Sequence, residues 1–350
     1  MWMTVLGLAM MQVDAMKALE PSRPIVIAHR GASGLRPEHT LASYGLAIEQ
    51  GADFIEPDVV MTKDGVLVAR HENEISGTTD VERHPEFADR RTTKLIDGRQ
   101  VTGWFTEDFT LAELKTLRAR ERLPQLRPAN MAWDGQEEVP TLQEIIDLVK
   151  SREGTRGKRI GLYIETKHPT YFREAGLPLE EALARLLAKN GYGKAEDPVF
   201  IQSFEVANLK RLKALTGVRL VQLLDGSGGP ADGTKLSYAA MATTAGLKEI
   251  ATYAAGVGPA KALILPRDAE GRSAQPTSFI VDAHAAGLVV HPWTFRSENY
   301  FLPLENRRGA LQKRGDAAAE YRRFIELGVD GVFSDFPADA IAATETLTAP

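Results

Sequence analysis

The chain has 350 residues, of which 42 are Lys or Arg and 47 are Asp or Glu, so its formal net charge is −5. This mild acidity argues against a nucleic-acid binder, which normally carries a basic domain or stripe. The chain contains no cysteine, which excludes disulfides, thiolate zinc sites, iron–sulfur clusters and a cysteine nucleophile. Any metal site must therefore be built from carboxylates, histidines or backbone oxygens.

The first residues form an apolar segment. Residues 1–11 are too few to span a bilayer but match the core of a signal peptide, and Val13-Asp14-Ala15 resembles a small-x-small cleavage site. The basic residues that usually precede such a core are missing. We interpret residues 1–23 either as a signal-peptide remnant of a periplasmic or secreted protein, or as an ordinary N-terminus of a cytoplasmic one. Elsewhere no segment approaches transmembrane length, so stable membrane insertion is not expected.

After this segment, short apolar runs alternate with helical patterns. The expected strands are residues 24–30, 54–60, 66–71, 160–166, 199–204, 219–224, 288–294 and 331–336, with a short apolar element at 255–259. The expected helices are residues 40–50, 142–151, 179–189, 206–215, 239–254, 277–286 and 316–327. Apolar strands joined by helices predict an α/β fold with a parallel sheet covered on both faces. About eight such units favour a closed (β/α)8 TIM barrel.

A doubly wound sheet is the alternative fold. It would be expected to carry a glycine-rich phosphate-binding fingerprint after its first strand, and residues 30–34 do not fit one. Residues 73–139 interrupt the alternation, because they are polar and rich in proline and glycine. A stretch this long inside a compact domain is usually functional. We therefore expect a single TIM-barrel domain over residues 24–345 that contains a small capping insertion at 73–139.

Polar residues gather where the expected strands end, which is where catalytic groups of α/β barrels lie. Glu56 and Asp58 alternate along one strand, so their side chains point the same way. Burying both carboxylates unpaired in the barrel would cost several kcal/mol. A hard cation removes that cost, and oxygen ligands select Ca²⁺ or Mg²⁺. The other polar residues at strand ends are His29, Arg30, His71, Glu165 and Lys167.

This set of groups suits cleavage of a phosphodiester. A cation would bind a phosphate oxygen and lower the pKa of a coordinated hydroxyl. Arg30 would hold the phosphate with its two-pronged guanidinium, and Lys167 would offset developing charge. The two histidines would share acid and base duty near neutral pH.

The same residues carry a family resemblance. The motifs are His29-Arg30-Gly31-Ala32-Ser33-Gly34, Pro37-Glu38-His39-Thr40-Leu41, Gly51-Ala52-Asp53, Glu56-x-Asp58, Val68-x-x-His71, Glu165-x-Lys167, Gln202-Ser203-Phe204, Val290-His291-Pro292-Trp293-Thr294 and Phe333-Ser334-Asp335-Phe336-Pro337. In order and spacing over residues 25–340, the chain resembles a glycerophosphodiester phosphodiesterase, and specifically the longer, calcium-dependent periplasmic type. Residues 73–139 resemble the capping insertion of that family.

The resemblance implies a role for each residue. Glu56, Asp58 and Glu165 would hold one divalent cation, with Ca²⁺ favoured over Mg²⁺. His29 and His71 would form the acid–base pair, Arg30 and Lys167 would contact the phosphate, Glu38 would orient Arg30 or the histidines, and Phe204 and Trp293 would wall the pocket. A glycerol hydroxyl of the substrate would attack phosphorus, and water would open the resulting cyclic phosphate. The products would be glycerol 3-phosphate and an alcohol.

Other functions stay open at this stage. A phospholipase D-like enzyme on the same barrel would act on lysophospholipids, with Tyr300 and Phe301 at its entry. A non-catalytic binding module would keep the fold and lose site residues, whereas all the expected positions hold competent side chains. A glycosidase would explain neither Arg30 nor the histidines. The expected partner is thus a small phosphodiester. The sequence indicates neither which alcohol head group is preferred nor the oligomeric state.

Overall fold

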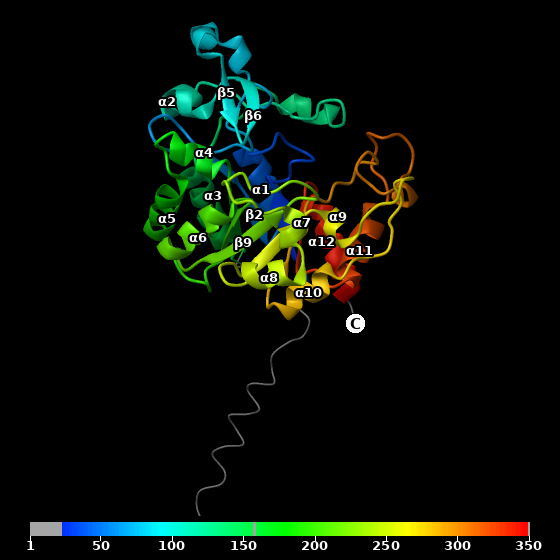
Figure 1. Ribbon diagram of the computed structural model, residues 1–350. Helices are drawn as coiled ribbons and strands as arrows, with labels where there is room; N and C mark the ends of the chain where they lie inside the picture. The colour runs from blue at the N-terminus through cyan, green and yellow to red at the C-terminus, as the bar shows by residue number, and fades with distance from the viewer. Residues whose placement is uncertain (1–22, 157–158, 349–350) are drawn as a thin grey trace, which may run out of the picture.

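The computed structural model describes residues 23–156 and 159–348, in which helices surround a central sheet and a smaller extension rises from one end (Figure 1). The strands are β1 (Ile25–His29), β2 (Phe54–Glu56), β3 (Asp58–Met61), β4 (Leu67–Ala69), β5 (Thr92–Ile96), β6 (Arg99–Gly103), β7 (Gly161–Thr166), β8 (Val199–Ser203), β9 (Arg219–Leu224), β10 (Gly256–Pro259), β11 (Val289–Val290) and β12 (Gly331–Ser334). The α-helices are α1 (Leu41–Glu49), α2 (Leu111–Leu114), α3 (Leu142–Arg156), α4 (Pro169–Glu174), α5 (Leu179–Lys189), α6 (Val206–Leu215), α7 (Tyr238–Met241), α8 (Thr244–Ile250), α9 (Lys261–Ile264), α10 (Phe279–Ala285), α11 (Ala317–Glu326) and α12 (Pro337–Thr348).

Eight parallel strands form a barrel in chain order. β1 pairs with β12 and β2, β7 lies between β2 and β8, and β9, β10 and β11 follow. The ring closes between β11 and β12, where the backbone N–H of Asp330 donates to Val290 at 3.0 Å and that of Phe295 donates to Phe333 at 2.8 Å. The predicted TIM barrel is therefore confirmed, and the doubly wound alternative is wrong.

The barrel interior is layered because inward-facing side chains recur every second residue along a strand. One layer is apolar and mostly aromatic, made by Ile27, Phe54, Tyr163, Phe200, Val221 and Phe333. Two residues further along β1, β2, β7 and β8 come His29, Glu56, Glu165 and Gln202, which register side by side as His29↔Glu56 and Glu165↔Gln202. The period of two thus places polar groups directly above an aromatic floor, at the carboxyl ends of the strands.

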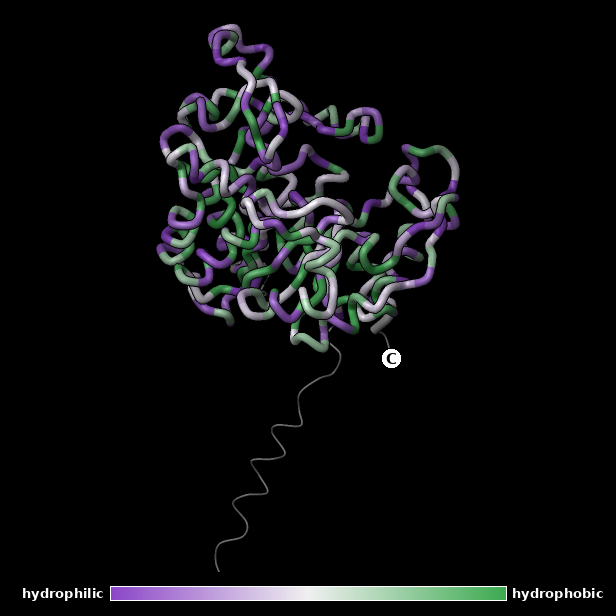
Figure 2. The backbone as a smooth tube through the Cα atoms, in the orientation of Figure 1, coloured by the Kyte–Doolittle hydropathy of each residue, from purple (hydrophilic) through white to green (hydrophobic). Residues whose placement is uncertain are grey.

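Helices cover the outside of the barrel by burying one face each. In α5, Leu179, Leu183 and Leu187 recur every four residues and are all fully buried. Burial of each such side chain contributes about 1.5–3 kcal/mol. Figure 2 shows hydrophobic residues throughout the barrel wall and mostly hydrophilic residues at the tip of the extension. In the described part of the chain, no helix is both long and apolar enough to cross a membrane.

Several elements differ from the sequence-based expectation. The predicted strand 54–60 is interrupted at Pro57, which has no N–H to donate, so β2 and β3 are separate strands. The predicted helix 239–254 is two helices, because Thr243 caps a new helix by accepting a hydrogen bond from the N–H of Gly246. β3 and β4 form an antiparallel hairpin around residues 63–65.

The expected insertion, residues 73–139, shares the core of the barrel, because Phe87, Trp104 and Phe109 belong to the same buried hydrophobic cluster as the barrel residues. It contains the antiparallel hairpin β5–β6 and the short helix α2. Trp104, Phe105 and Phe109 are buried in it. The tip of the hairpin lies against the ends of the barrel strands, since Asp97 accepts a hydrogen bond of 2.6 Å from Nδ1 of His168. The predicted signal-peptide remnant, apart from Arg23, lies outside the described residues.

Candidate active site

A cavity of about 830 Å³ opens at the carboxyl ends of the barrel strands, beneath the β5–β6 hairpin. Its lining includes most of the predicted site residues: His29, Arg30, Glu56, His71, Glu165, Lys167, Phe204 and Trp293. Glu38 and Asp58 lie just behind this lining, where both are buried and both contact Arg30. The structure therefore brings together every residue that the sequence assigned to the site.

Three buried carboxylates cluster at and just behind the cavity lining. Oxygens of Glu56, Asp58 and Glu165 lie within 4.8 Å of one another, although Glu56 precedes the break at Pro57 and Asp58 follows it. Burial, helped by the neighbouring charge of Asp58, outweighs the attraction of Lys167 and raises the pKa of Glu165 to about 8. Burial and the charges of Asp58 and Glu165 likewise hold the pKa of Glu56 well above its usual range.

This cluster fits a hard divalent cation. Oδ1 of Asp58 is buried and has no hydrogen-bond partner among the described residues. Three buried carboxylates repel one another, and an ion with oxygen ligands relieves that repulsion. Nζ of Lys167 lies 2.5 Å from Glu165 and 3.5 Å from Asp58, so it neutralises part of the charge. Glu56, Asp58 and Glu165 are accordingly the residues that would hold a metal.

Arg30 is held in place through its backbone and its side chain. Its backbone is left-handed, with φ of +59°, and its N–H donates to Oε2 of Glu56 at 2.8 Å. Its guanidinium lies 3.1 Å from Glu38 and 3.3 Å from Asp58. A non-glycine residue in this conformation is strained, and such strain persists where the surroundings hold it. The guanidinium is thus fixed at the rim of the acidic cluster.

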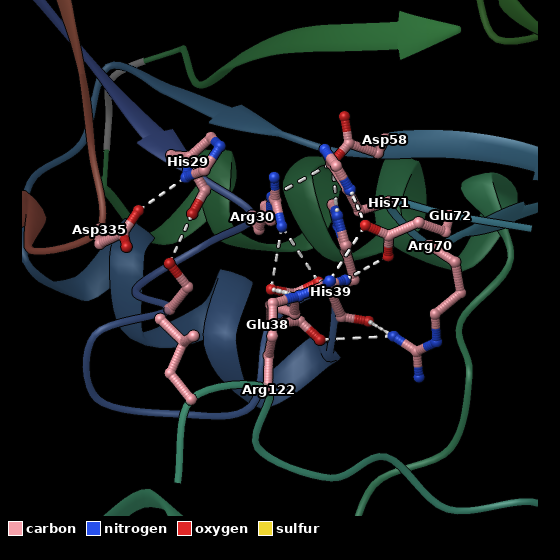
Figure 3. A network of polar contacts seen from close by, with 12 residues as sticks. His29, Arg30, Glu38, His39, Asp58, Arg70, His71, Glu72, Arg122 and Asp335 are labelled. Carbon is pink, nitrogen blue, oxygen red and sulfur yellow. Dashed lines mark hydrogen bonds and ion pairs between the residues drawn. The ribbon is translucent and has the colours of Figure 1, made fainter. Parts of the chain in front are cut away.

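His29 and His71, the two histidines predicted to be catalytic, are each paired with a carboxylate through Nδ1 (Figure 3). Nδ1 of His29 lies 2.6 Å from Asp335, and Nδ1 of His71 lies 2.5 Å from Glu72. Burial, followed by the charge of Arg30, lowers the pKa of His29 to about 4 and that of His71 to about 3. Both rings are therefore neutral at pH 7. Because an ionised carboxylate only accepts, Nδ1 carries the proton and Nε2 is left free to accept one.

Glu38 was expected to orient Arg30 or the histidines. It contacts Arg30 directly, and it accepts two hydrogen bonds, of 2.8 and 2.7 Å, from Arg122 of the insertion. Arg122 in turn binds Glu72, the partner of His71. Glu38 therefore contacts Arg30 directly, whereas it is linked to His71 only through Arg122 and Glu72.

Other polar residues of the site were missed or misread in the sequence. His39 belongs to the Pro37–Leu41 motif but was given no role; Thr40 caps α1, and Nε2 of His39 lies 2.8 Å from Asp58. Asp335 belongs to the Phe333–Pro337 motif but was given no role; it contacts Nδ1 of His29. For Glu72 the available signal was its position next to His71, whereas Arg122 and Arg127 had no signal in the sequence.

The far wall of the cavity is aromatic. The rings of Phe204 and Trp293 meet edge to face at 5.7 Å, and Tyr238 packs on Phe204 at 5.9 Å. Tyr300 and Phe301, the residues expected at the entry in the lysophospholipid alternative, pack on each other at 5.0 Å and are not part of the lining. The apolar wall of the cavity is thus supplied mainly by barrel loops.

The fold and the site together define an α/β-barrel enzyme with a polar, acid-lined mouth. The model of the glycerophosphoryl diester phosphodiesterase family matches residues 29–339, so the chain belongs to that family. It is similar to the glycerophosphodiester phosphodiesterase GDPD6 of Arabidopsis thaliana, with 37% identity over 91% of this chain and 86% of the relative. It is also similar to the glycerophosphodiester phosphodiesterase of Haemophilus influenzae, with 30% identity over 90% of this chain and 88% of the relative.

Solved structures share the fold. A glycerophosphoryl diester phosphodiesterase from Silicibacter pomeroyi has a TM-score of 0.66 at 22% identity, covering 94% of this chain and 95% of its own. A phosphodiesterase from Oleispira antarctica has a TM-score of 0.63 at 23% identity, covering 92% of this chain and 97% of its own. The barrel is therefore common to these proteins and this chain.

Proposed function

We propose that the protein hydrolyses glycerophosphodiesters to glycerol 3-phosphate and an alcohol. The observation that carries this proposal is that seven groups gather in or just behind one cavity at the barrel mouth: Glu56, Asp58, Glu165, His29, His71, Arg30 and Lys167. The family and the names of the relatives give the same reaction. The Oleispira antarctica phosphodiesterase structure holds sn-glycerol-3-phosphate as product, which also agrees with it.

The residues of the cavity have complementary tasks. Arg30 and Lys167 bind the phosphate oxygens and offset the charge that develops on them. A divalent cation at Glu56, Asp58 and Glu165 would polarise the phosphate and lower the pKa of a hydroxyl bound near it. The aromatic wall at Phe204 and Trp293 faces the less polar part of the substrate.

His29 and His71 carry the proton transfers. One neutral imidazole accepts on Nε2 the proton of a glycerol hydroxyl as its oxygen attacks phosphorus; the other ring first takes a proton from water on its own Nε2 and then gives it to the departing alcohol. The first step forms a cyclic phosphate and breaks the bond to the alcohol. Water then opens the ring, so that the products are glycerol 3-phosphate and the alcohol.

The metal and the location are further parts of the proposal. Oxygen ligands of this kind suit either ion, and calcium is favoured over magnesium because the resemblance is to the calcium-dependent type. The apolar residues 1–11 and the cleavage-like Val13-Asp14-Ala15 support a periplasmic or secreted protein. Mass spectrometry of the mature N-terminus tests the location: an intact residue 1 in protein isolated from its natural host contradicts export by cleavage.

The reaction and the metal are tested in one assay. The release of choline or ethanolamine from glycerophosphodiesters is measured in EDTA and then after calcium or magnesium is restored. We expect release to fall to background in EDTA and to return with calcium. Undiminished release in EDTA contradicts the metal site. A panel that includes lysophospholipids separates the alternatives, since preferential release of lysophosphatidic acid would favour the phospholipase D-like reaction.

A further inference from the structure

Two arginines of the insertion reach from outside the barrel into its polar mouth. Arg122 and Arg127 lie in the irregular stretch before the turn of 3₁₀-helix at residues 128–133. Their side chains are 27% and 6% exposed, so both are largely withdrawn from solvent. Each bridges two carboxylates, and one of those two carboxylates is the partner of a cavity histidine. The insertion therefore contacts both histidines through a single intervening residue.

Arg127 is on the His29 side. Its Nη2 lies 2.5 Å from Oδ2 of Asp335, while Oδ1 of the same carboxylate lies 2.6 Å from Nδ1 of His29. Its Nε donates to Glu298 at 2.6 Å and its Nη1 to the backbone oxygen of Ser33 at 3.0 Å. Each nitrogen of the Arg127 guanidinium thus has a hydrogen-bond partner. These contacts restrict the orientation of the Asp335 carboxylate.

Arg122 is on the His71 side. Its Nη1 and Nη2 lie 3.0 and 2.6 Å from the two oxygens of Glu72, and Oε1 of Glu72 lies 2.5 Å from Nδ1 of His71. Its Nε and Nη2 also bind Glu38, which holds Arg30 (Figure 3). A two-pronged arginine–carboxylate pair has a strongly preferred geometry, which a lysine does not reproduce.

We propose that Arg122 and Arg127 are positioning residues for catalysis: each locks the carboxylate that keeps the proton of one histidine on Nδ1, so that Nε2 is presented to the substrate. This inference rests on the proposed function, because it takes the two histidines as the acid–base pair. It makes the insertion a working part of the active site, since it orients the proton-transfer groups as well as covering the cavity.

The arginines affect catalysis through the tautomer of the histidine rings. A neutral imidazole carries its proton on either nitrogen, and the partner of one nitrogen decides which. If Asp335 loses Arg127, its carboxylate can rotate away from His29, although Arg296 still lies 2.9 Å from it. A fraction of the rings then carries the proton on Nε2 and cannot act as base. Loss of such supporting contacts typically lowers activity about 10- to 100-fold.

The main experiment is a pair of double-mutant cycles on kcat and KM, measured from initial rates with substrate in excess. Arg127→Ala is combined with His29→Ala, and Arg122→Ala with His71→Ala. We expect each arginine change to lower kcat about 10- to 100-fold alone, with a smaller change in KM. Arg127→Ala should add little once His29 is gone, whereas Arg122→Ala should add less in the His71→Ala background than alone and keep only the part that acts through Glu38 and Arg30. In the crossed combinations, such as Arg127→Ala with His71→Ala, the losses should multiply. Equal additional losses in both histidine backgrounds would overturn the proposal.

A spectroscopic readout separates positioning from structural support. Nitrogen-15 NMR of the imidazoles reports which ring nitrogen carries the proton. We expect Arg127→Ala to move only the His29 signals towards a mixture of tautomers, and Arg122→Ala only those of His71. Unchanged tautomers in both variants contradict the proposal. The NMR measurement needs no turnover, so it tests the positioning of the histidines even if the protein does not hydrolyse glycerophosphodiesters. Failure of the proposed function would be seen separately, as an inactive wild-type protein.

Two further variants distinguish a loss of positioning from a loss of folding. Arg118 belongs to the same insertion, but its guanidinium binds backbone oxygens and lies 3.8 Å from Glu138, away from both histidine pairs. Arg118→Ala should leave kcat and both tautomers unchanged. If Arg127→Ala fails to fold, Arg127→Lys keeps the charge but cannot bridge Asp335 and Glu298 together. We expect it to lower kcat about 10-fold, and full activity in that variant would count against the proposal.

Discussion

Glu165→Gln should change the stability of the protein in opposite directions with and without a metal. Without a metal, the folded state raises the pKa of Glu165 from 4.5 to about 8. A raised carboxyl pKa means that stability is fully present below the unfolded value and is lost as pH rises through the folded value. The loss in EDTA therefore falls between about pH 4.5 and pH 8.

The size of the effect follows from the pKa. At pH 7, roughly 2.5 pH units above the ordinary value, the buried group costs about 3 kcal/mol at 1.36 kcal/mol per unit. Glutamine removes this cost but also removes the 2.5 Å contact with Lys167. We therefore expect the EDTA-treated variant to be about 1–3 kcal/mol more stable than wild type at pH 8, with a smaller difference at pH 5.

Calcium should reverse the order of stabilities. A ligand that binds only the folded state stabilises it by about 2.7 kcal/mol at a concentration 100 times its Kd. Wild type should gain this stabilisation. Glu165→Gln should gain much less, because one of its three clustered ligands is then a neutral amide. Urea unfolding at pH 5 and pH 8, in EDTA and in calcium, measures all these differences.

The matched control is Glu205→Gln. Glu205 lines the same cavity, and burial raises its pKa to about 7, but it is not one of the three clustered carboxylates. The calcium-dependent gain in stability should survive this change. The reasoning is refuted if Glu165→Gln is less stable than wild type in EDTA at pH 8, or if calcium stabilises wild type and Glu165→Gln equally.

Three further outcomes are expected. His29→Ala and His71→Ala should each lower kcat about 10²- to 10⁴-fold, as loss of general acid–base catalysis does; near wild-type alcohol release from either would remove that histidine from the mechanism. Trp293→Ala should raise KM for glycerophosphodiesters more than it lowers kcat, because it removes a wall of the cavity, and an unchanged KM in initial-rate measurements would contradict this. Gly161→Ala should destabilise the fold by about 1–3 kcal/mol in urea unfolding, since the new Cβ would lie 2.1 Å from ring atoms of Phe54; wild-type stability would show that the ring moves aside freely.

The barrel was predictable because its determinants are local. Each apolar run and each helical pattern is readable within a few residues, and the period of two places Glu56 and Glu165 on inward faces without knowledge of the neighbours. The same local reasoning failed at the predicted helix 239–254, where Thr243 starts a second helix within one continuous apolar pattern. Apolar periodicity reports burial, and each helix buries two residues three positions apart: Tyr238 and Met241 in α7, and Leu247 and Ile250 in α8.

The candidate site was likewise predictable only in part. The sequence by itself determined which residues stand at the strand ends, and hence the carboxylates, the histidines, Arg30 and Lys167. Only the tertiary structure decided what holds the histidines, because Arg127 contacts Asp335 across 208 positions and Arg122 contacts Glu38 across 84. Charged residues in an irregular insertion have no periodicity to mark them. Their partners depend on how the insertion packs over the barrel, which is a property of the folded chain alone.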